Sequence, residues 1–175
     1  MSVLVRFAAL LPAAIALSAK PPQFIDYPVL KVYRSEAALP KFGNPLQYDG
    51  TDLRCFGADR QSYAGKRANF AGHFVIDACT CGTGCHYLFM WDALNGNFFG
   101  RIPIGVINVE PYGLGSVDGP IEYRGEQYRV DSALLIVEGC VEDTCDCAKR
   151  YYQWNGRRFR LLLKVPSKMP PECRK

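Results

Sequence analysis

The sequence predicts an all-β domain: an antiparallel meander that forms a barrel, a sandwich or a propeller-like sheet, with at most one or two short helices. Three observations support this fold class. From residue 70 onward, segments rich in Tyr, Phe, Val, Ile and Leu follow one another, most of them bounded by Gly, Asn, Asp or Pro. Asn-Gly dipeptides, which favour tight hairpins, follow two of these segments. No amphipathic helical pattern of about 12 residues interrupts the series.

Six segments are expected to form strands. They are FVIDA (74–78), YLFMWDAL (87–94), FFGRIPIG (98–105), QYRVDSALLIVE (127–138), YYQW (151–154) and RFRLLLKV (158–165). Asn95-Gly96 and Asn155-Gly156 have the composition of type I′ hairpin turns, in which both central residues take a positive φ. Hairpins so close together in sequence imply antiparallel pairing.

The segments outside these strands have a different character. Residues 20–68 contain Pro, Gly and Tyr with little periodicity, so we expect them to wrap the sheet. Within them, residues 35–41 favour one short helix, which Ser35 would cap and Pro40 would stop. The tail PSKMPPECRK at residues 166–175 favours no regular element.

The first nineteen residues have the features of a secretory signal peptide. A short segment with one positive charge precedes an apolar run, residues 7–19, that ends in small residues, and Lys20-Pro21-Pro22 follows it. We expect cleavage near Ala19 and a single disulfide-stabilised β domain over residues 20–175. The apolar run is shorter than the roughly 20 residues of a transmembrane helix, so we expect no stable membrane insertion. A periplasmic or secreted location follows from the signal peptide.

The charge balance is mild. The chain carries 21 Lys+Arg and 17 Asp+Glu, and loss of Arg6 with the signal peptide would leave 20 − 17 = +3. So small an excess argues against nucleic acid as a partner. The basic stretch at residues 149–164 alternates with aromatic and aliphatic residues, which favours a hairpin with one charged face.

All eight cysteines lie after the predicted cleavage site. They are Cys55, Cys79, Cys81, Cys85, Cys140, Cys145, Cys147 and Cys173. An even count after a signal peptide is typical of a disulfide framework in an oxidising compartment. Zinc is the alternative, but the C-x-C start of the first cluster is atypical of zinc knuckles. We therefore expect no metal site and no cofactor.

The histidines raise the question of catalysis. His73 and His86 are the only imidazoles, and both are close in sequence to the first cysteine cluster. On a strand His73 would share a face with Val75 and Asp77, and a His–Asp pair can orient an imidazole. A surface polar contact or a satisfied core histidine explains the same pattern and is favoured. The sequence holds no G-x-S-x-G elbow, phosphate loop or HExxH motif.

The segment EGCVEDTCDC, residues 138–147, places carboxylates between cysteines. Its acidic residues are Glu138, Glu142, Asp143 and Asp146. Their spacing matches no EF-hand calcium loop. A rigid acidic loop could enter the basic cleft of a partner protein and gain affinity from preorganisation. A solvated turn bounded by disulfides is the simpler interpretation.

Three stretches together resemble a group of small exported bacterial proteins without an assigned function. They are KRANFAGHFVIDACTCGTGC…MWDALNGNFFG, YRVDSALLIVEG and RYYQWNGRRFRLL, and the resemblance covers approximately residues 50–163. The shared pattern is NFAGHY, a strand, CGTGC, a strand ending in D-x-x-TG, then S-x-LL and YY-x-W. This chain departs from it with Cys79 in place of a large residue, with Asn95-Gly96 in place of Thr-Gly, and with the extra Cys145 and Cys147. The resemblance implies the fold and export, and no activity.

The disulfide framework can be narrowed within that pattern. Gly82 and Gly84 let the chain double back, so Cys81 and Cys85 could approach closely enough to pair. The two isolated cysteines, at positions 55 and 173, would form a second bridge. Cys79 would pair with one of the cysteines at positions 140, 145 and 147, and the remaining two would pair with each other.

We therefore expect an exported, non-enzymatic protein-binding module, such as an inhibitor of a cell-wall hydrolase or an immunity protein against a periplasmic toxin. The supporting observations are the size, the export signal, the disulfides and the lack of a catalytic motif. The alternative is a thiol- or metal-dependent enzyme that uses the cluster from Cys79 to His86. The sequence predicts no oligomeric state.

Overall fold

The computed structural model describes residues 20–43, 60–82, 85–108, 125–141 and 146–167. The predicted signal peptide lies outside these residues, as do Cys55, Cys145, Cys173, Glu142 and Asp143. Among the residues that are described, no helix is long and apolar enough to cross a membrane.

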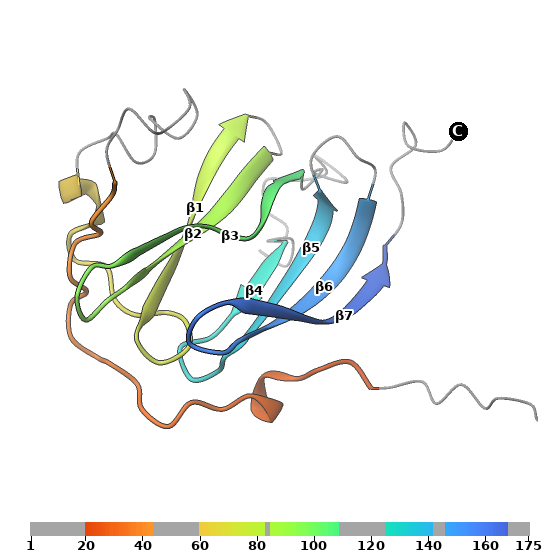
Figure 1. Cartoon of the computed structure of the whole chain (residues 1–175), viewed down its shortest axis with the longest axis horizontal. Helices are drawn as coiled ribbons and strands as arrows, with labels where there is room; N and C mark the ends of the chain where they lie inside the picture. The colour runs from red at the N-terminus through yellow and green to blue at the C-terminus, as the bar shows by residue number, and fades with distance from the viewer. Residues whose placement is uncertain (1–19, 44–59, 83–84, 109–124, 142–145, 168–175) are drawn as a thin grey trace, which may run out of the picture.

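The described chain is built almost entirely from antiparallel strands (Figure 1). The elements are η1 (Phe24–Asp26), η3 (Arg60–Tyr63), β1 (Phe74–Gly82), β2 (Cys85–Asp92), β3 (Phe98–Asn108), β4 (Glu126–Tyr128), β5 (Leu134–Val141), β6 (Asp146–Trp154) and β7 (Phe159–Pro166). The strands pair in the order β1-β2-β3-β5-β6-β7, and β4 pairs with β5 off this path. The all-β prediction is confirmed.

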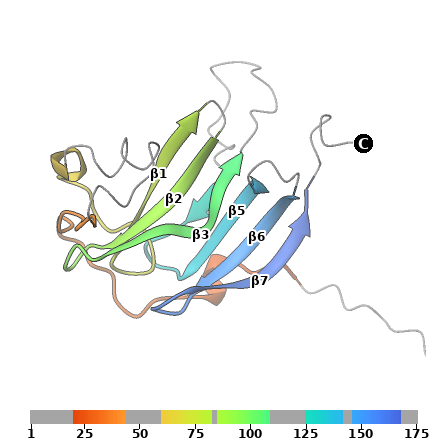
Figure 2. The same ribbon diagram turned by 45° about the horizontal axis from the view of Figure 1, so that its top comes forward.

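The sheet divides into two halves at the junction of β3 and β5. These two strands share only the register pairs Ile107↔Val141 and Asn108↔Cys140, whereas β1·β2, β2·β3, β5·β6 and β6·β7 pair along most of their lengths. Figures 1 and 2 show β1–β3 and β4–β7 diverging from that junction. Since β1 and β7 are the two ends of the strand order, the described sheet is open and sandwich-like, not a closed barrel.

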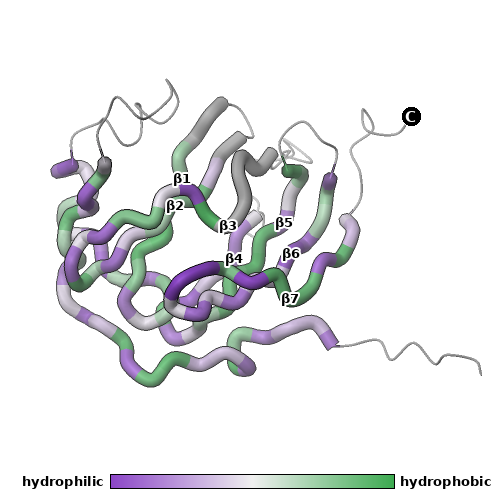
Figure 3. Tube along the Cα trace, viewed as in Figure 1, coloured by the Kyte–Doolittle hydropathy of each residue, from purple (hydrophilic) through white to green (hydrophobic). Residues whose placement is uncertain are grey.

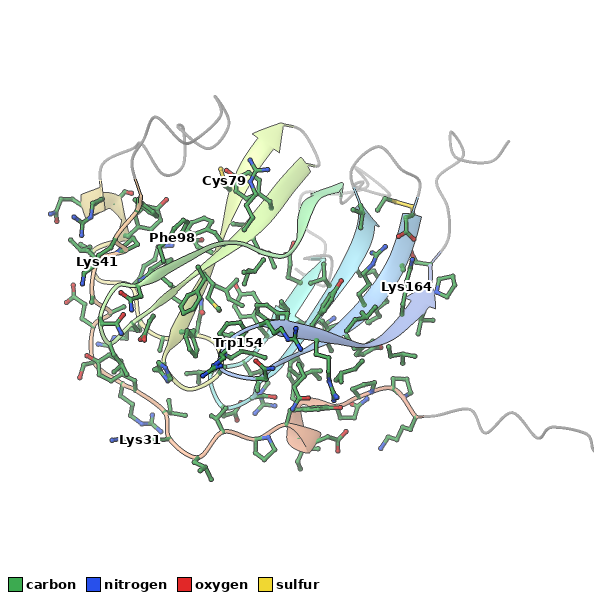
Figure 4. All side chains as sticks on the ribbon, viewed as in Figure 1. Lys31, Lys41, Cys79, Phe98, Trp154 and Lys164 are labelled. Carbon is green, nitrogen blue, oxygen red and sulfur yellow. A yellow bond between two sulfur atoms is a disulfide. The ribbon has the colours of Figure 1, made fainter. Side chains whose placement is uncertain are left out.

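The space between the two halves holds the main apolar core. Its buried members are Phe70, Ala71, Phe74, Ile76, Leu88, Met90, Ile102, Leu135, Val137, Tyr152 and Trp154. Trp154 makes edge-to-face contact with Phe74 at 5.4 Å between ring centroids. Each large side chain buried in this way stabilises the fold by about 1.5–3 kcal/mol. Figure 4 shows Trp154 among the side chains enclosed by the two halves.

A second apolar layer covers the outer face of β1–β3. Trp91, Phe89 and Tyr87 point to this face and are fully buried. They pack beneath η3 and beneath residues 33–42, and the Trp91 indole Nε1 donates a hydrogen bond to the Ala38 carbonyl at 3.0 Å. Figure 3 shows apolar positions along the strands of both halves. Apolar residues on both faces of β1–β3 fit a sheet with both faces covered.

The outer face of β5 and β6 is covered by the beginning of the same N-terminal segment. Phe24 and Tyr27 pack against Leu134, Ile136 and Tyr151. We call residues 20–42 the N-terminal strap, because it crosses from the outer face of one half to the outer face of the other (Figure 1). The expectation that this region wraps the sheet is confirmed for the part described.

The short helix expected over residues 35–41 is wrong. The backbone there is extended, with Ala37 N donating to Lys66 O, Ala38 N to Ala93 O and Lys41 N to Gly96 O. Each of these bonds goes to a distant segment, so hydrogen bonds to the rest of the fold hold the backbone extended in place of a helix. Within the described residues, short 3-10 turns form elsewhere, at η1 and η3.

The single strand expected over residues 127–138 is also wrong, because a turn divides it into β4 and β5. Arg129 forms a two-point ion pair with Asp131, and the Ser132 hydroxyl accepts a hydrogen bond from Leu134 N. These local side-chain bonds stabilise a turn without glycine or proline. The turn allows β4 and β5 to pair with each other in register from Glu126↔Val137 to Tyr128↔Leu135.

The two Asn-Gly hairpins form between β2 and β3 and between β6 and β7, but neither is type I′. Gly96 and Gly156 have φ values of 75° and 89°, whereas Asn95 and Asn155 do not have positive φ. The asparagine side chains act instead as local acceptors, since Asn155 Oδ1 binds the backbone N–H groups of the two arginines that follow the glycine. The hairpin prediction is confirmed and the turn type is corrected.

Candidate functional site

The NFAGH motif, residues 69–73, is a tight loop that leads into β1. Asn69 Nδ2 donates to the Ile76 carbonyl and Asn69 Oδ1 accepts from Ile76 N, both at 2.8 Å. The Asn69 side chain therefore makes with Ile76 the two hydrogen bonds that a backbone residue of a neighbouring strand would make. Phe70 is fully buried in the main core.

The middle of the motif joins the strap to the β4–β5 turn. Ala71 and Gly72 have φ values of 42° and 87°, which reverse the chain direction. Gly72 N donates to Val130 O, and Gly72 O accepts from Tyr33 N, both at 2.7 Å. A Cβ at Gly72 would lie 2.5 Å from the Lys31 carbonyl oxygen, so only glycine fits. The motif has a structural role at these positions.

His73 lies in the turn that directly precedes β1, and not on the strand as expected, beside the beginning of the β2–β3 turn. Its Nε2 is 3.9 Å from Asp92 Oδ2, and its side chain is 37% exposed. Asp92 also accepts hydrogen bonds from Leu94 N at 2.8 Å and Asn95 Nδ2 at 3.0 Å. The acidic partner is thus Asp92, brought opposite by the β1·β2 register, and not Asp77.

Asp77, the partner that the sequence pattern offered to His73, pairs with Lys66. Within the described chain, His73 has no hydrogen bond to a serine, threonine or cysteine. A His–Asp pair without a nucleophile supplies a surface ion pair when the imidazole is protonated, and it supplies no catalytic triad.

The CGTGC segment contributes the last residues of β1 and the first residue of β2. β1 and β2 stay paired as far as Gly82↔Cys85, with one register shift between Thr80 and Gly82. The side chains of Cys81, Cys85 and His86 lie outside the described part of the chain, so the Cys81–Cys85 bridge stays a prediction.

Cys79 lies on β1 under the outer apolar layer and is 1% exposed. It is disulfide-bonded, to a cysteine whose side chain is not among those described. A buried, oxidised sulfur can act neither as a nucleophile nor as a metal ligand. Cys79 is therefore unavailable to the alternative hypothesis, a thiol- or metal-dependent enzyme that uses the cluster from Cys79 to His86.

The far end of the β5–β6 hairpin is closed by a disulfide between Cys140 and Cys147 (Figure 4). The two residues face each other in the antiparallel register. This bond excludes both as partners of Cys79, and it agrees with the expectation that two of the three cysteines in this cluster pair. It sits directly at the base of the segment that carries Glu142 and Asp143.

A buried arginine fastens the same end of the hairpin. Arg150 is 3% exposed, and its guanidinium donates to Gly139 O at 3.1 Å, Ala148 O at 3.3 Å and Asp146 O at 2.7 Å. It also forms an ion pair with the Asp146 carboxylate at 2.9 Å. Because Gly139 is on β5 and the other acceptors are on β6, one side chain ties both strands together.

Asp146 joins this fastening to β7. Lys164 Nζ lies 2.7 Å from Asp146 Oδ1, and the Lys164 hydrogen bond, together with Arg150, lowers the pKa of the Asp146 carboxyl. The expected acidic loop thus has its last carboxylate neutralised by two cations. Glu138 lies 3.6 Å from Lys149 Nζ at the surface. In the described residues, no group of three or more His, Cys, Asp or Glu side chains could hold a metal ion.

The basic stretch at residues 149–164 does not form one charged face. Arg150 points into the protein, whereas Arg157 and Arg158 are exposed at the β6–β7 turn. Arg157 and Arg158 are therefore separated from the acidic hairpin end by the length of β6, whereas Lys164 pairs with Asp146 at that end. Arg150 was not expected to be buried, although its alternation with Ala148 and Tyr152 places it on their inward face.

Comparison of the chain with protein-family models, with curated proteins and with solved structures finds no match. The resemblance to small exported bacterial proteins therefore stays a prediction, and the candidate sites must be judged from their own geometry.

Proposed function

We propose that the chain is an exported, non-enzymatic protein that binds another protein through the acidic end of the β5–β6 hairpin. An inhibitor of a cell-wall hydrolase, or an immunity protein against a periplasmic toxin, would have this character. Export would follow cleavage of the predicted signal peptide near Ala19.

The observation that carries the proposal is the double fastening of the hairpin end. The Cys140–Cys147 bond and the buried Arg150 guanidinium both join the ends of β5 and β6 that flank the acidic segment in sequence. A loop whose base is held in this way loses little conformational entropy on binding. In sequence the segment adds Glu142 and Asp143, which suit a basic cleft on the partner.

The proposal can be tested with purified peptidoglycan hydrolases acting on cell-wall suspensions. The protein should slow lysis, and the double substitution Glu142→Gln with Asp143→Asn should weaken inhibition at least about tenfold by lowering the association rate. The matched control is Asp118→Asn with Glu122→Gln, which removes the same charge from another segment. If lytic activity is untouched and an affinity column of the protein retains no periplasmic partner, the proposal is wrong.

A thiol enzyme is the alternative class, and it depends on a free cysteine. The chain has eight cysteines, so the intact mass without reductant should be eight hydrogens below that of the fully reduced chain. One or two free thiols beside His86 would favour the enzyme instead.

A further inference from the structure

An open hollow lies where the strap passes between the NFAGH loop and the β4–β5 turn. Its volume is about 550 Å³, and each of the three segments contributes to its lining. Val32 and Arg34 come from the strap, Ala68 precedes the motif, and Arg129 and its neighbours come from the turn. This volume is within the range of about 300–1,000 Å³ that is typical of small-molecule sites.

The hollow has an uncompensated positive charge. Its lining contains Arg34, Arg129 and Asp131, so the formal sum is 2 − 1 = +1. Asp131 is fully engaged by Arg129, with Oδ1 2.8 Å from Nε and Oδ2 2.6 Å from Nη2. This pair lowers the pKa of the Asp131 carboxyl, which keeps it ionised and committed to Arg129.

Arg34 is the cation that is left over. In the described part of the chain its guanidinium has no hydrogen bond and no ion pair. Glu36 is the nearest carboxylate along the strap, but Glu36 Oε1 accepts the Gly65 N–H at 2.8 Å. Arg34 is exposed, so all five of its donors are free to meet a ligand.

The opposite wall is held in place before any ligand arrives. The Arg129 guanidinium lies 5.7 Å from the centre of the Phe24 ring, and Asp131 fixes its orientation. The Asp131 carbonyl accepts the Val29 N–H at 3.1 Å, which secures the turn to the strap. A preorganised wall reduces the entropy lost on binding.

Besides Tyr128 and Asn69, whose amide atoms are bonded to the Ile76 backbone, the remaining lining is the apolar set Val32, Ala68 and Val130. A small inorganic anion would leave these side chains in water, whereas a ligand with an apolar body would cover them. A carboxylate offers two oxygens that match the paired donors of a guanidinium.

From this arrangement we propose that the hollow binds a carboxylate attached to a small apolar group, with Arg34 as the residue that pairs with the carboxylate. The C-terminal residue of a peptide and a free aliphatic acid share this chemistry. The site is separate from the acidic hairpin end, so this proposal does not depend on the proposed binding of a partner protein there.

The test is a titration of the ¹⁵N-labelled protein with N-acetyl-leucine, followed by NMR. Shifts should be confined to residues at the hollow, with a dissociation constant on the order of millimolar for so small a ligand. N-acetyl-leucinamide keeps the apolar body without the charge, and N-acetylglycine keeps the charge without most of the body. Both should bind at least about tenfold more weakly.

Arg34→Gln should weaken N-acetyl-leucine binding about tenfold or more, and Arg157→Gln, an exposed arginine on the β6–β7 turn, should leave it unchanged. Tighter binding of N-acetyl-alanyl-leucine than of 4-methylpentanoate would assign the site to peptide ends, and the reverse would assign it to aliphatic acids. The proposal is overturned if the shifts lie elsewhere, if the carboxamide binds equally well, or if Arg34→Gln binds N-acetyl-leucine as well as wild type does. It is also overturned if no shifts appear at a ligand concentration 50-fold above the expected dissociation constant, on the order of 50 mM.

Discussion

Gly72 connects the strap to the rest of the fold, and its replacement by alanine gives the sharpest test of that connection. With φ at 87°, alanine would be held in the left-handed region at a cost of roughly 1–2 kcal/mol. Its Cβ would also meet the Lys31 carbonyl oxygen at 2.5 Å, so the strap must move away. Movement would weaken the Tyr33 N–H bond to Gly72 O, which contributes about 1 kcal/mol.

We expect Gly72→Ala to lower the free energy of unfolding by about 2–3 kcal/mol as the sum of these effects. The matched control is Gly156→Ala, because Gly156 has a similar φ of 89° but nothing within 4 Å of its hypothetical Cβ. The control should lose only the conformational cost, about 1–2 kcal/mol. The effect of alanine on the unfolded chain is common to both variants and cancels.

Urea unfolding followed by tryptophan fluorescence measures both losses. Limited trypsin digestion adds local information, because cleavage after Lys31 and Arg34 requires the strap to leave the surface. Only Gly72→Ala should accelerate cleavage at these two sites. Equal losses of stability for the two variants, with equal rates of strap cleavage, would refute the role assigned to Gly72.

Three further predictions concern the hairpin end and the buried indoles. Arg150→Met should cost about 2–4 kcal/mol in urea unfolding because it leaves carbonyl groups of both strands without a donor, whereas Arg157→Met should change stability by less than about 0.5 kcal/mol. Since ion pairing lowers the folded-state pKa of Asp146, the stability that it contributes is present above the unfolded pKa of about 4 and is lost as the pH falls through the folded pKa. Wild type should therefore exceed Asp146→Asn in stability at pH 7, and the gap should close towards pH 2; an unchanged gap would contradict the assignment. Trp91→Phe should cost about 1 kcal/mol more than Trp154→Phe, because the Trp91 N–H has an acceptor and the buried Trp154 N–H has none in the described structure.

The strands and hairpins could be predicted because the information for them is local. Segments rich in aromatic and branched apolar residues mark β1, β2, β6 and β7, and Asn-Gly marks the turns that follow β2 and β6. The glycines do take positive φ at both turns. Only the role of the asparagines differs, because their side chains bind nearby groups of the turn instead of letting the backbone adopt a positive φ.

The strap could not be predicted in the same way, because its hydrogen bonds are made to distant segments. Ala37 and Ala38 favour a helix by propensity, yet their N–H groups bind Lys66 and Ala93. Nothing in residues 35–41 alone indicates those acceptors. The same holds for Arg34, whose significance depends on a hollow that three separate segments create.

The partner of His73 depends on the register of the β1·β2 hairpin and on a bulge within it. Counting back from Gly82↔Cys85 in unbroken register would place Phe74 opposite Ala93, and the register shift between Thr80 and Gly82 brings Phe74 opposite Asp92 instead. Asp92 is then the natural acidic neighbour of His73. The sequence pattern favoured Asp77 instead, because it relates only residues that would share a face of one strand with His73 and not those on the neighbouring strand.

The strap also sets the order in which the protein can be completed. The Ser132 hydroxyl lies 2.8 Å from the Phe24 carbonyl oxygen, a contact between residues 108 positions apart. The apolar surface that receives Phe24 and Tyr27 further requires Tyr151, which is on β6. The beginning of the strap, although it is synthesised before the rest of the described chain, is therefore among the last parts to pack. Until then the apolar outer face of β5 and β6 stays uncovered and open to other molecules, because long-range closure of the chain is slow.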